Sequence, residues 1–172
     1  MIKQTLETKD LILTRSKKYD VEKLHNNFLG QEDTAKYMLW SVTKSPMDAK
    51  EKMEKWLESH RLMYLAYEKE SDEPIGFVTI DELKNKPTVF GDIGICVGKE
   101  YLRKGYGSQM LNAVCTYCQD ELCATKFIYS HMEGNIASER LAKKFGFQCI
   151  GTKKKMKAGR GYKEIFYERD ID

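Results

Sequence analysis

The sequence has no long hydrophobic run, and this absence limits what the protein can be. No apolar stretch approaches the roughly 18–20 residues that a membrane-spanning helix needs. The segment Met1–Asp10 is polar and carries four charged side chains, so it lacks the apolar middle part of a secretory signal peptide. We therefore predict a cytoplasmic protein with no membrane partner.

Proline is also scarce, with 3 residues in 172, and no Pro-rich or Gly/Ser-rich segment separates one part of the chain from another. Internal repeats and low-complexity tracts are absent as well. A chain of this length can bury one proper hydrophobic core. The sequence thus predicts a single domain over residues 1–172.

An excess of charge of one sign is missing too. The chain has 29 Lys and Arg against 26 Asp and Glu, a formal net charge of +3. Proteins that bind nucleic acid usually show a far larger basic excess. We therefore predict no nucleic-acid partner.

Cysteine occurs 5 times, and an odd number in a cytoplasmic chain favours free thiols. Cys115 and Cys118 have the CxxC spacing of a zinc site, but no second CxxC or nearby His pair supplies the other ligands. We interpret both as small core residues of a helix and predict no metal site.

Apolar periodicity and turn residues divide the chain into alternating elements. The helix that begins at Ser45-Pro46 has the clearest start, because Ser caps helices and Pro suits their first turn. Strands are expected at residues 11–16, 63–67, 75–80, 89–97, 127–130, 148–152 and 163–167. Helices are expected at residues 20–28, 45–60, around 110–118 and at 135–145. This order predicts a mixed sheet with helices on its faces, an α/β or α+β fold.

Glycines mark two irregular places in the predicted sheet. Gly91 and Gly94 lie inside the strand at residues 89–97 and predict a bulge or local splay there. Gly159-Arg160-Gly161 predicts the turn between the last two strands.

The most informative segment is Tyr101–Ser108, which follows a predicted strand and opens a helix. Gly105 and Gly107 let the backbone approach a ligand closely. The free amides at a helix start suit an anion, and Arg103 and Lys104 add positive charge beside them. The spacing is neither that of a P-loop nor that of a dinucleotide-binding fingerprint. The segment predicts a seat for a phosphate or pyrophosphate group.

Two linked segments carry a resemblance to a known family. Arg103–Ser108, after the strand Asp92–Val97, resembles the acetyl-CoA-binding motif Q/R-x-x-G-x-G/A of the GNAT N-acetyltransferases. Asn135–Phe147 is similar to the N-x-x-S/A…K-x-G-F segment of the same family. The two segments follow each other in the order that the family requires. The usual Gln or Arg at the first motif position is Leu102 here, so a side-chain contact is lost unless Arg103 replaces it.

The resemblance implies a GNAT fold: a mixed, mostly antiparallel seven-stranded sheet, about four flanking helices and a splayed central strand pair. Acetyl-CoA, the implied cosubstrate, would lie in the gap between the strands at residues 92–97 and 127–130. The cofactor-binding residues would be Ile95, Cys96 and Val97 through their backbone, then Arg103, Lys104, Gly105, Tyr106, Gly107, Ser108, Asn135 and Ser138. Lys143 and Lys144 are alternatives for the adenosine phosphates, although a solvated helix face also explains them.

The resemblance also implies that a base removes a proton from the acceptor amine and that an acid protonates the departing thiolate. Asp92 is the first candidate for the base, followed by Asp81 and Glu82. Ser138 is the candidate for the acid. Other residues considered for this chemistry are Tyr162, Tyr167 and His131.

The acceptor pocket is expected between the segment Gln31–Ser41 and the loop at Lys157–Tyr162. Tyr37, Met38 and Trp40 are the candidate substrate-binding residues. Glu32 and Asp33 could attract a cationic amine.

The resemblance thus implies an N-acetyltransferase that moves an acetyl group from acetyl-CoA to a primary amine by direct attack in a ternary complex. The acceptor could be a protein N-terminus or a small molecule, because Leu11–Ser16 and Gly161–Glu164 resemble the RimJ/RimL-type branch, which holds both kinds. A catalytically idle acetyl-CoA sensor remains the alternative. Homodimers are common among similar proteins, but the sequence carries no dimer signature.

Overall fold

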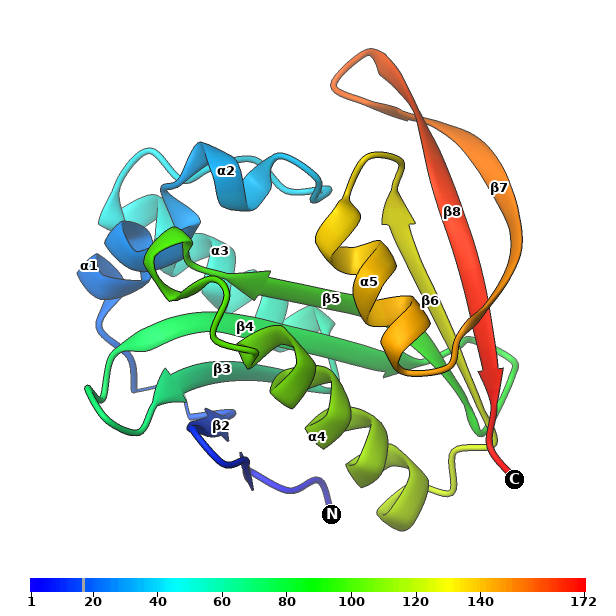
Figure 1. Ribbon diagram of the computed structural model, residues 1–172. Helices are drawn as coiled ribbons and strands as arrows, with labels where there is room; N and C mark the ends of the chain where they lie inside the picture. The colour runs from blue at the N-terminus through cyan, green and yellow to red at the C-terminus, as the bar shows by residue number, and fades with distance from the viewer. Residues whose placement is uncertain (17) are drawn as a thin grey trace.

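A single eight-stranded sheet forms the centre of the computed structural model, which describes residues 1–16 and 18–172. The strand order is β1-β2-β3-β4-β5-β6-β8-β7 (Figure 1). The strands are β1 (Thr5–Glu7), β2 (Leu11–Thr14), β3 (Met63–Glu68), β4 (Pro74–Glu82), β5 (Val89–Val97), β6 (Lys126–Met132), β7 (Gln148–Lys157) and β8 (Arg160–Asp170). All neighbours pair antiparallel except β5 and β6, which are parallel. The predicted mixed sheet and α/β class are confirmed.

Helices cover both faces of this sheet. They are α1 (Val21–Leu24), α2 (Glu32–Ala35), α3 (Pro46–Ser59), α4 (Tyr106–Glu121) and α5 (Ile136–Lys144), with a π-helical turn at His25–Leu29 and a 3₁₀ turn at Lys99–Tyr101. Helices α4 and α5 lie on one face, in front of the sheet in Figure 1, and α1 and α3 pack against the other face, while α2 lies along the upper edge in this view. Two cores result, one on each face of β4.

The predicted helix starts are present. The amide of Asp48 donates to Ser45 Oγ at 3.1 Å, and Pro46 occupies the first turn of α3. The amide of Ser138 donates to Asn135 Oδ1 at 3.2 Å, which caps α5. Such caps stabilise a helix by about 1 kcal/mol each, because they satisfy amides that lack an intrahelical partner.

The central strands β5 and β6 separate soon after they meet. Their paired residues are only Val89 with Lys126 and Phe90 with Phe127, although β5 continues to Val97 and β6 to Met132. The gap that opens between them lies under α4 and α5 in Figure 1. The splayed strand pair predicted from the family resemblance is therefore present.

The expected bulge lies at the point where β5 bends. The register of β4 against β5 shifts between Thr79 and Asp81. Thr79 Oγ1 accepts from the amide of Gly94 at 3.1 Å and donates to the carbonyl of Asp92 at 3.2 Å. A Cβ at position 94 would come within 2.8 Å of Thr79 Oγ1, so glycine permits this close approach.

The strand count of seven is wrong, because β1 adds an eighth strand at the sheet edge. Its three residues, Thr-Leu-Glu, offer one apolar side chain, Leu6, which is too little for a periodic signal. The register with β2 supplies the pairing instead, from Thr5 with Thr14 to Glu7 with Ile12.

The last hairpin is also longer than its sequence suggests. β7 extends to Lys157 and β8 begins at Arg160, so the turn is Ala158–Gly159 and not Gly159–Gly161. Both turn residues have positive φ, +49° and +76°, as two-residue hairpin turns require. Pairing with β8 keeps the lysine-rich, solvent-exposed end of β7 extended, and the hairpin projects from the body (Figure 1).

Candidate active site

Two cavities share a wall at strand β5, where it leaves β6. The first, here called the α4 groove, has a volume of about 300 Å³ and lies beside the start of α4. The second, the aromatic pocket, has a volume of about 440 Å³. Tyr37 and Met38 line both cavities. Strand β5 contributes residues 95–97 to the groove and residues 92–94 to the pocket, so ligands of the two cavities would meet at this strand.

The α4 groove ends at a turn with free backbone amides. Gly105 precedes α4 in a left-handed conformation, with φ +78°, and Arg103 is also left-handed, with φ +63°. The first hydrogen bond of α4 runs from the amide of Gln109 to the carbonyl of Gly105 at 3.1 Å. The amides of residues 106–108 therefore have no intrahelical acceptor, and they lie at the positive end of a 16-residue helix.

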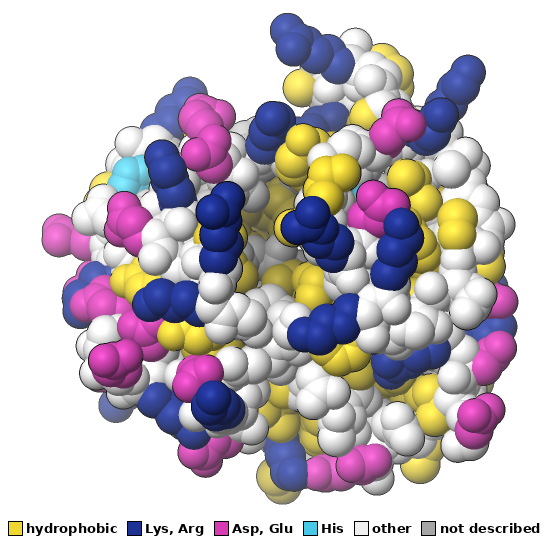
Figure 2. Space-filling model, viewed as in Figure 1, with side chains coloured by type: hydrophobic (Ala, Val, Ile, Leu, Met, Phe, Trp, Pro, Cys, Tyr) yellow, Lys and Arg dark blue, Asp and Glu magenta, His cyan; other side chains and the backbone are white. Residues whose placement is uncertain are grey.

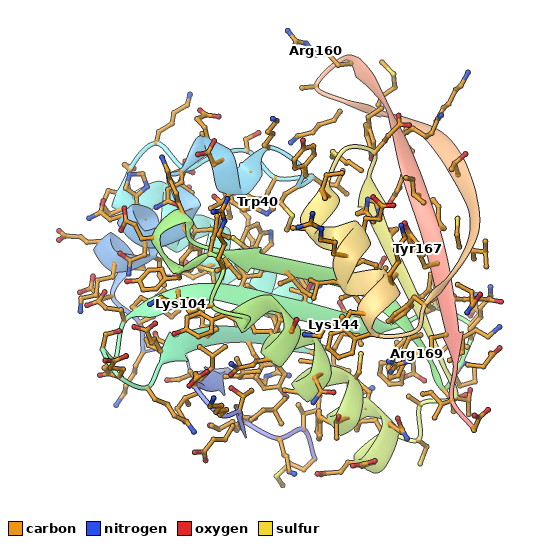
Figure 3. The ribbon with its side chains drawn as sticks, viewed as in Figure 1. Trp40, Lys104, Lys144, Arg160, Tyr167 and Arg169 are labelled. Carbon is orange, nitrogen blue, oxygen red and sulfur yellow. The ribbon has the colours of Figure 1, made fainter. Side chains whose placement is uncertain are left out.

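Basic side chains surround this groove. Figure 2 shows several Lys and Arg side chains around the central hollow, and Lys99 and Arg103 are among the residues that line it. Lys144 reaches the turn from α5, since its Nζ donates to Ser108 Oγ at 3.0 Å (Figure 3). Lys143 instead forms an exposed ion pair with Glu139. Of these two lysines, Lys144 is therefore the one that reaches the first turn of α4.

Lys104 is the one predicted cofactor residue that does not line the groove. Its Nζ lies 3.2 Å from Oε2 of Glu68, a buried carboxylate of β3. Tyr106 OH also donates to Glu68, and so does Ser71 Oγ at 2.8 Å. The hydrogen bond from Tyr106, followed by those from Ser71 and Lys104, lowers the pKa of Glu68. Through these bonds, Glu68 links the turn before α4 to strand β3.

Glu68→Gln is expected to destabilise the fold by about 2 kcal/mol, because several bonds to a buried carboxylate are weakened together. The folded pKa of Glu68 is lowered, so its contribution is present above the pKa of the unfolded chain and is lost as pH falls through the folded value. The stability difference between wild type and variant, measured by urea unfolding, should therefore be largest near pH 7 and shrink in acid. Glu70→Gln, an exposed neighbour, is the control; equal effects of the two changes would contradict the role of Glu68.

Strand β5 forms one wall of the α4 groove, and some of its backbone amides have no partner in the sheet. The amides of Gly94 and Gly98 point toward β4, where they donate to Thr79 Oγ1 and to the carbonyl of Ile75. Because successive amides of a strand alternate, those of Ile95 and Val97 point toward the gap. Cys96 lines the groove, but its backbone faces β4, and burial raises the pKa of its thiol. Only Ile95 and Val97 among the three predicted residues can therefore donate an amide to a ligand in the gap.

Helix α5 presents Ser138 to the same groove. Its amide is held by the Asn135 cap, and its Oγ accepts from Tyr129 OH at 3.1 Å. Burial raises the pKa of Tyr129, so this phenol keeps its proton. The pair can supply a proton to an atom in the groove. The sequence gives no signal for this role of Tyr129, because its position on β6 is that of a core residue.

Apolar side chains form one side of the aromatic pocket. Trp40 packs edge-on against Trp56 at 5.7 Å between ring centroids, and Trp56 lies 5.1 Å from Phe77. Lys157 Nζ donates to the carbonyls of Ala35 and Met38, which ties the β7–β8 hairpin to the segment that carries Tyr37 and Trp40. The structure thus brings together the two segments expected to build this pocket.

Polar residues form the opposite side. Asp92, the first candidate for the base, is exposed and lines the pocket in a left-handed conformation, with φ +50°. Glu164 also lines it, but Ser130 Oγ donates to its Oε1 at 2.7 Å and Lys155 pairs with its Oε2. Asp92 is therefore the more available carboxylate of the two.

The remaining candidates separate into two groups. Tyr162 and His131 line the aromatic pocket, and Asp81 does not. The Oδ2 atom of Asp81 lies 2.6 Å from Nδ1 of His60, a pocket residue that the sequence analysis does not single out. Tyr167 is buried, and its OH bonds to His131 Nε2 at 3.0 Å, while His131 Nδ1 lies 2.8 Å from the carbonyl of Met132 (Figure 3 labels Tyr167). His131 thus borders the pocket with both ring nitrogens engaged, and Tyr167 is one of its two partners.

Three further residues named in the sequence analysis, Glu82, Asp33 and Leu102, do not line the aromatic pocket. Glu82 is engaged outside it by Arg61 and by the amide of Thr88. Asp33 lines the α4 groove and pairs with Lys99 at 3.7 Å, so its charge faces the groove. Leu102, at the position usually Gln or Arg, is 54% exposed on the rim of the groove.

Among residues 1–16 and 18–172, no group of three or more metal-binding side chains lies together. Burial raises the pKa of the Cys115 and Cys118 thiols to about 12, as core residues of α4. No helix in the described part of the chain is long and apolar enough to cross a membrane.

The sequence matches the model of the GNAT acetyltransferase domain over residues 10–148. Solved structures share the fold: an acetyltransferase of the GNAT family from Bacillus anthracis has a TM-score of 0.85 at 19% identity, over 96% of this chain and 98% of that one. RimL, a ribosomal L7/L12 alpha-N-protein acetyltransferase in complex with coenzyme A, has a TM-score of 0.82 at 20% identity, over 98% of both chains. No curated protein matches the sequence significantly.

The matched domain spans most of the chain, so the class of protein is defined: this is an acetyltransferase domain. The chain belongs to the GNAT acetyltransferase family.

Proposed function

We propose that this protein transfers the acetyl group of acetyl-CoA to a primary amine by direct attack in a ternary complex. One observation carries the proposal: the α4 groove and the aromatic pocket meet at strand β5, beneath Tyr37 and Met38, which line both. Holding two reactants together in this way lowers the entropic part of the barrier.

The residues of the α4 groove fit coenzyme A. The unpartnered amides of residues 106–108 and the ammonium of Lys144 are suited to a diphosphate, because charge-assisted hydrogen bonds to anions are strong. The free amides of Ile95 and Val97 are suited to the amide groups of the pantetheine arm, which would pair with β5 as a short added strand. When bound, acetyl-CoA supplies an acetyl group already activated as a thioester.

The chain's own residues supply the remaining chemistry. The free amide of Ile95 or Val97 can donate to the oxygen that gains negative charge during transfer. Ser138, backed by Tyr129, can protonate the departing sulfur. Asp92 carries the negative charge that attracts an ammonium group to the aromatic pocket.

The residues that line the aromatic pocket also indicate which class of amine it can bind. Trp40, Trp56 and Phe77 offer flat apolar surface beside the Asp92 carboxylate. A cation over aromatic rings is stabilised by about 0.5–2 kcal/mol. This environment supports a primary amine with an apolar body, such as an apolar N-terminal residue or a small arylalkylamine.

The test is a thiol-release assay with acetyl-CoA and a panel of acceptors. We expect turnover with amines that have an aromatic or branched apolar body, at kcat/KM about tenfold above that of polyamines with similar charge. Coenzyme A binding with no turnover on any amine or N-terminal peptide would contradict the proposal and favour the acetyl-CoA sensor.

A further inference from the structure

The aromatic pocket contains a histidine–carboxylate pair that the family motifs do not include. His60 follows the last turn of α3, where its amide donates to the carbonyl of Trp56 at 2.8 Å. Its ring lines the pocket, and its Nδ1 lies 2.6 Å from Oδ2 of Asp81 on β4. The other ring nitrogen, Nε2, has no hydrogen-bond partner within the described residues.

Asp81 is itself held in place. Its Oδ1 accepts from the amide of Arg61 at 2.9 Å and from that of Leu62 at 3.4 Å. Its Oδ2 is thereby aimed at His60, and the side chain of Asp81 is only 18% exposed. A carboxylate fixed in this way keeps the proton of a neutral imidazole on Nδ1, so that Nε2 carries the lone pair.

We propose that His60, oriented by Asp81, takes the proton that the acceptor amine must lose before it attacks. This inference rests on the proposed function. It assigns the base to a residue other than Asp92, whose carboxylate then serves to bind the ammonium group.

Acetyl transfer removes two protons from the acceptor ammonium, and His60 takes the first of them. His60 Nε2 takes one proton from the acceptor ammonium and becomes an imidazolium, which Asp81 stabilises. The freed lone pair of the nitrogen forms the new C–N bond to the acetyl carbon, and the C–S bond to coenzyme A breaks with its electron pair going to sulfur. The nitrogen gives up its second proton as the amide forms, and Ser138 gives one proton to the sulfur. The proton released by the nitrogen restores the hydroxyl of Ser138 through solvent water. His60 then returns its proton to solvent.

The charges around His60 favour this role. Asp81 hydrogen-bonds the ring and raises its pKa above the usual 6.5, and Asp92 on β5 adds to the effect. Desolvation acts in the opposite direction. Glu164 of β8, which lines the same pocket, is paired with Lys155, and Arg61 is paired with Glu82. The base is the neutral imidazole of His60. It predominates above the raised pKa and is lost by protonation as pH falls below that pKa.

The first measurement is the pKa of His60 in the free protein, followed by NMR of the ring protons. We expect a value above 6.5 that falls in Asp81→Asn, because an amide facing Nδ1 no longer stabilises the imidazolium. The same value in wild type and in Asp81→Asn would overturn the orienting role of Asp81 without reference to turnover.

The second measurement is the pH profile of kcat/KM for wild type and three variants. His60→Gln should lower kcat by about 100-fold, a typical loss of a general base, and remove the acidic limb of the profile. Its KM for the amine should change by less than about threefold. Asp92→Asn should raise that KM by about tenfold and keep the limb. Asp72→Asn is a matched control for Asp92, since both are exposed and left-handed, with φ +59° and +50°.

The outcomes separate the inference from the proposed function. If the wild type transfers acetyl groups and His60→Gln keeps both the wild-type kcat and the fall of kcat/KM at low pH, the inference is overturned and the proposed function stands. A limb that disappears in Asp92→Asn and not in His60→Gln would return the base to Asp92. A wild-type protein that binds acetyl-CoA and acetylates no amine would end both.

Discussion

Gly105→Glu is expected to weaken acetyl-CoA binding by about 100-fold, which corresponds to nearly 3 kcal/mol of binding free energy. Gly105 caps α4 at the turn where the amides of residues 106–108 are unpartnered. A carboxylate there repels a diphosphate and competes with it for those amides. The dissociation constant, measured by isothermal titration calorimetry, checks this expectation.

Gly159→Glu provides a closely matched control. Gly105 and Gly159 have φ of +78° and +76°, and a Cβ at either position meets nothing within 4 Å. The backbone strain of the two substitutions is therefore similar. Gly159 lies next to Arg160, at the tip of the β7–β8 hairpin and far from α4 (Figure 3). Similar affinities of the two variants would show that the turn before α4 does not hold the cofactor.

Ser138→Ala is expected to lower kcat by about 100-fold and to change acetyl-CoA affinity by less than about threefold. The substitution removes the hydroxyl that accepts from Tyr129 and faces the α4 groove, but it keeps the backbone bond to Asn135 that caps α5. Tyr129→Phe should have a smaller effect on kcat, because it removes only the group behind the proton donor.

Ser108→Ala is the comparison for Ser138. Its hydroxyl also lines the groove, where it accepts from Lys144. We expect a few-fold loss of acetyl-CoA affinity and an unchanged kcat, because Ser108 lies at the phosphate end. A Ser138→Ala enzyme with wild-type kcat at saturating substrates would exclude Ser138 as the acid.

Local features of the sequence predict much of this molecule. Ser45-Pro46 and Asn135 mark helix starts because a cap is a contact within a few residues. The turn at Gly105 could be located because only glycine readily adopts its conformation before a helix start. The position of the α4 groove follows from these two starts, since residues of α4 and α5 line it together with β5.

Other features depend on contacts between distant segments and have no local signal. Strand β1 forms because β2 pairs with it, and the lysine-rich part of β7 is extended because β8 lies alongside. Lys104 looks like a phosphate ligand in the sequence, yet Glu68, 36 residues earlier, holds its ammonium group. His60 and Asp81 likewise lie 21 residues apart, so only the fold of α3 against β4 makes them a pair.

The most direct test of this account is a crystal structure with bound coenzyme A or acetyl-CoA. We expect the diphosphate within hydrogen-bond distance of the amides of residues 106–108, with the pantetheine arm along Ile95–Val97 and the sulfur near Ser138. A cofactor seated elsewhere, with those amides facing solvent, would contradict the account.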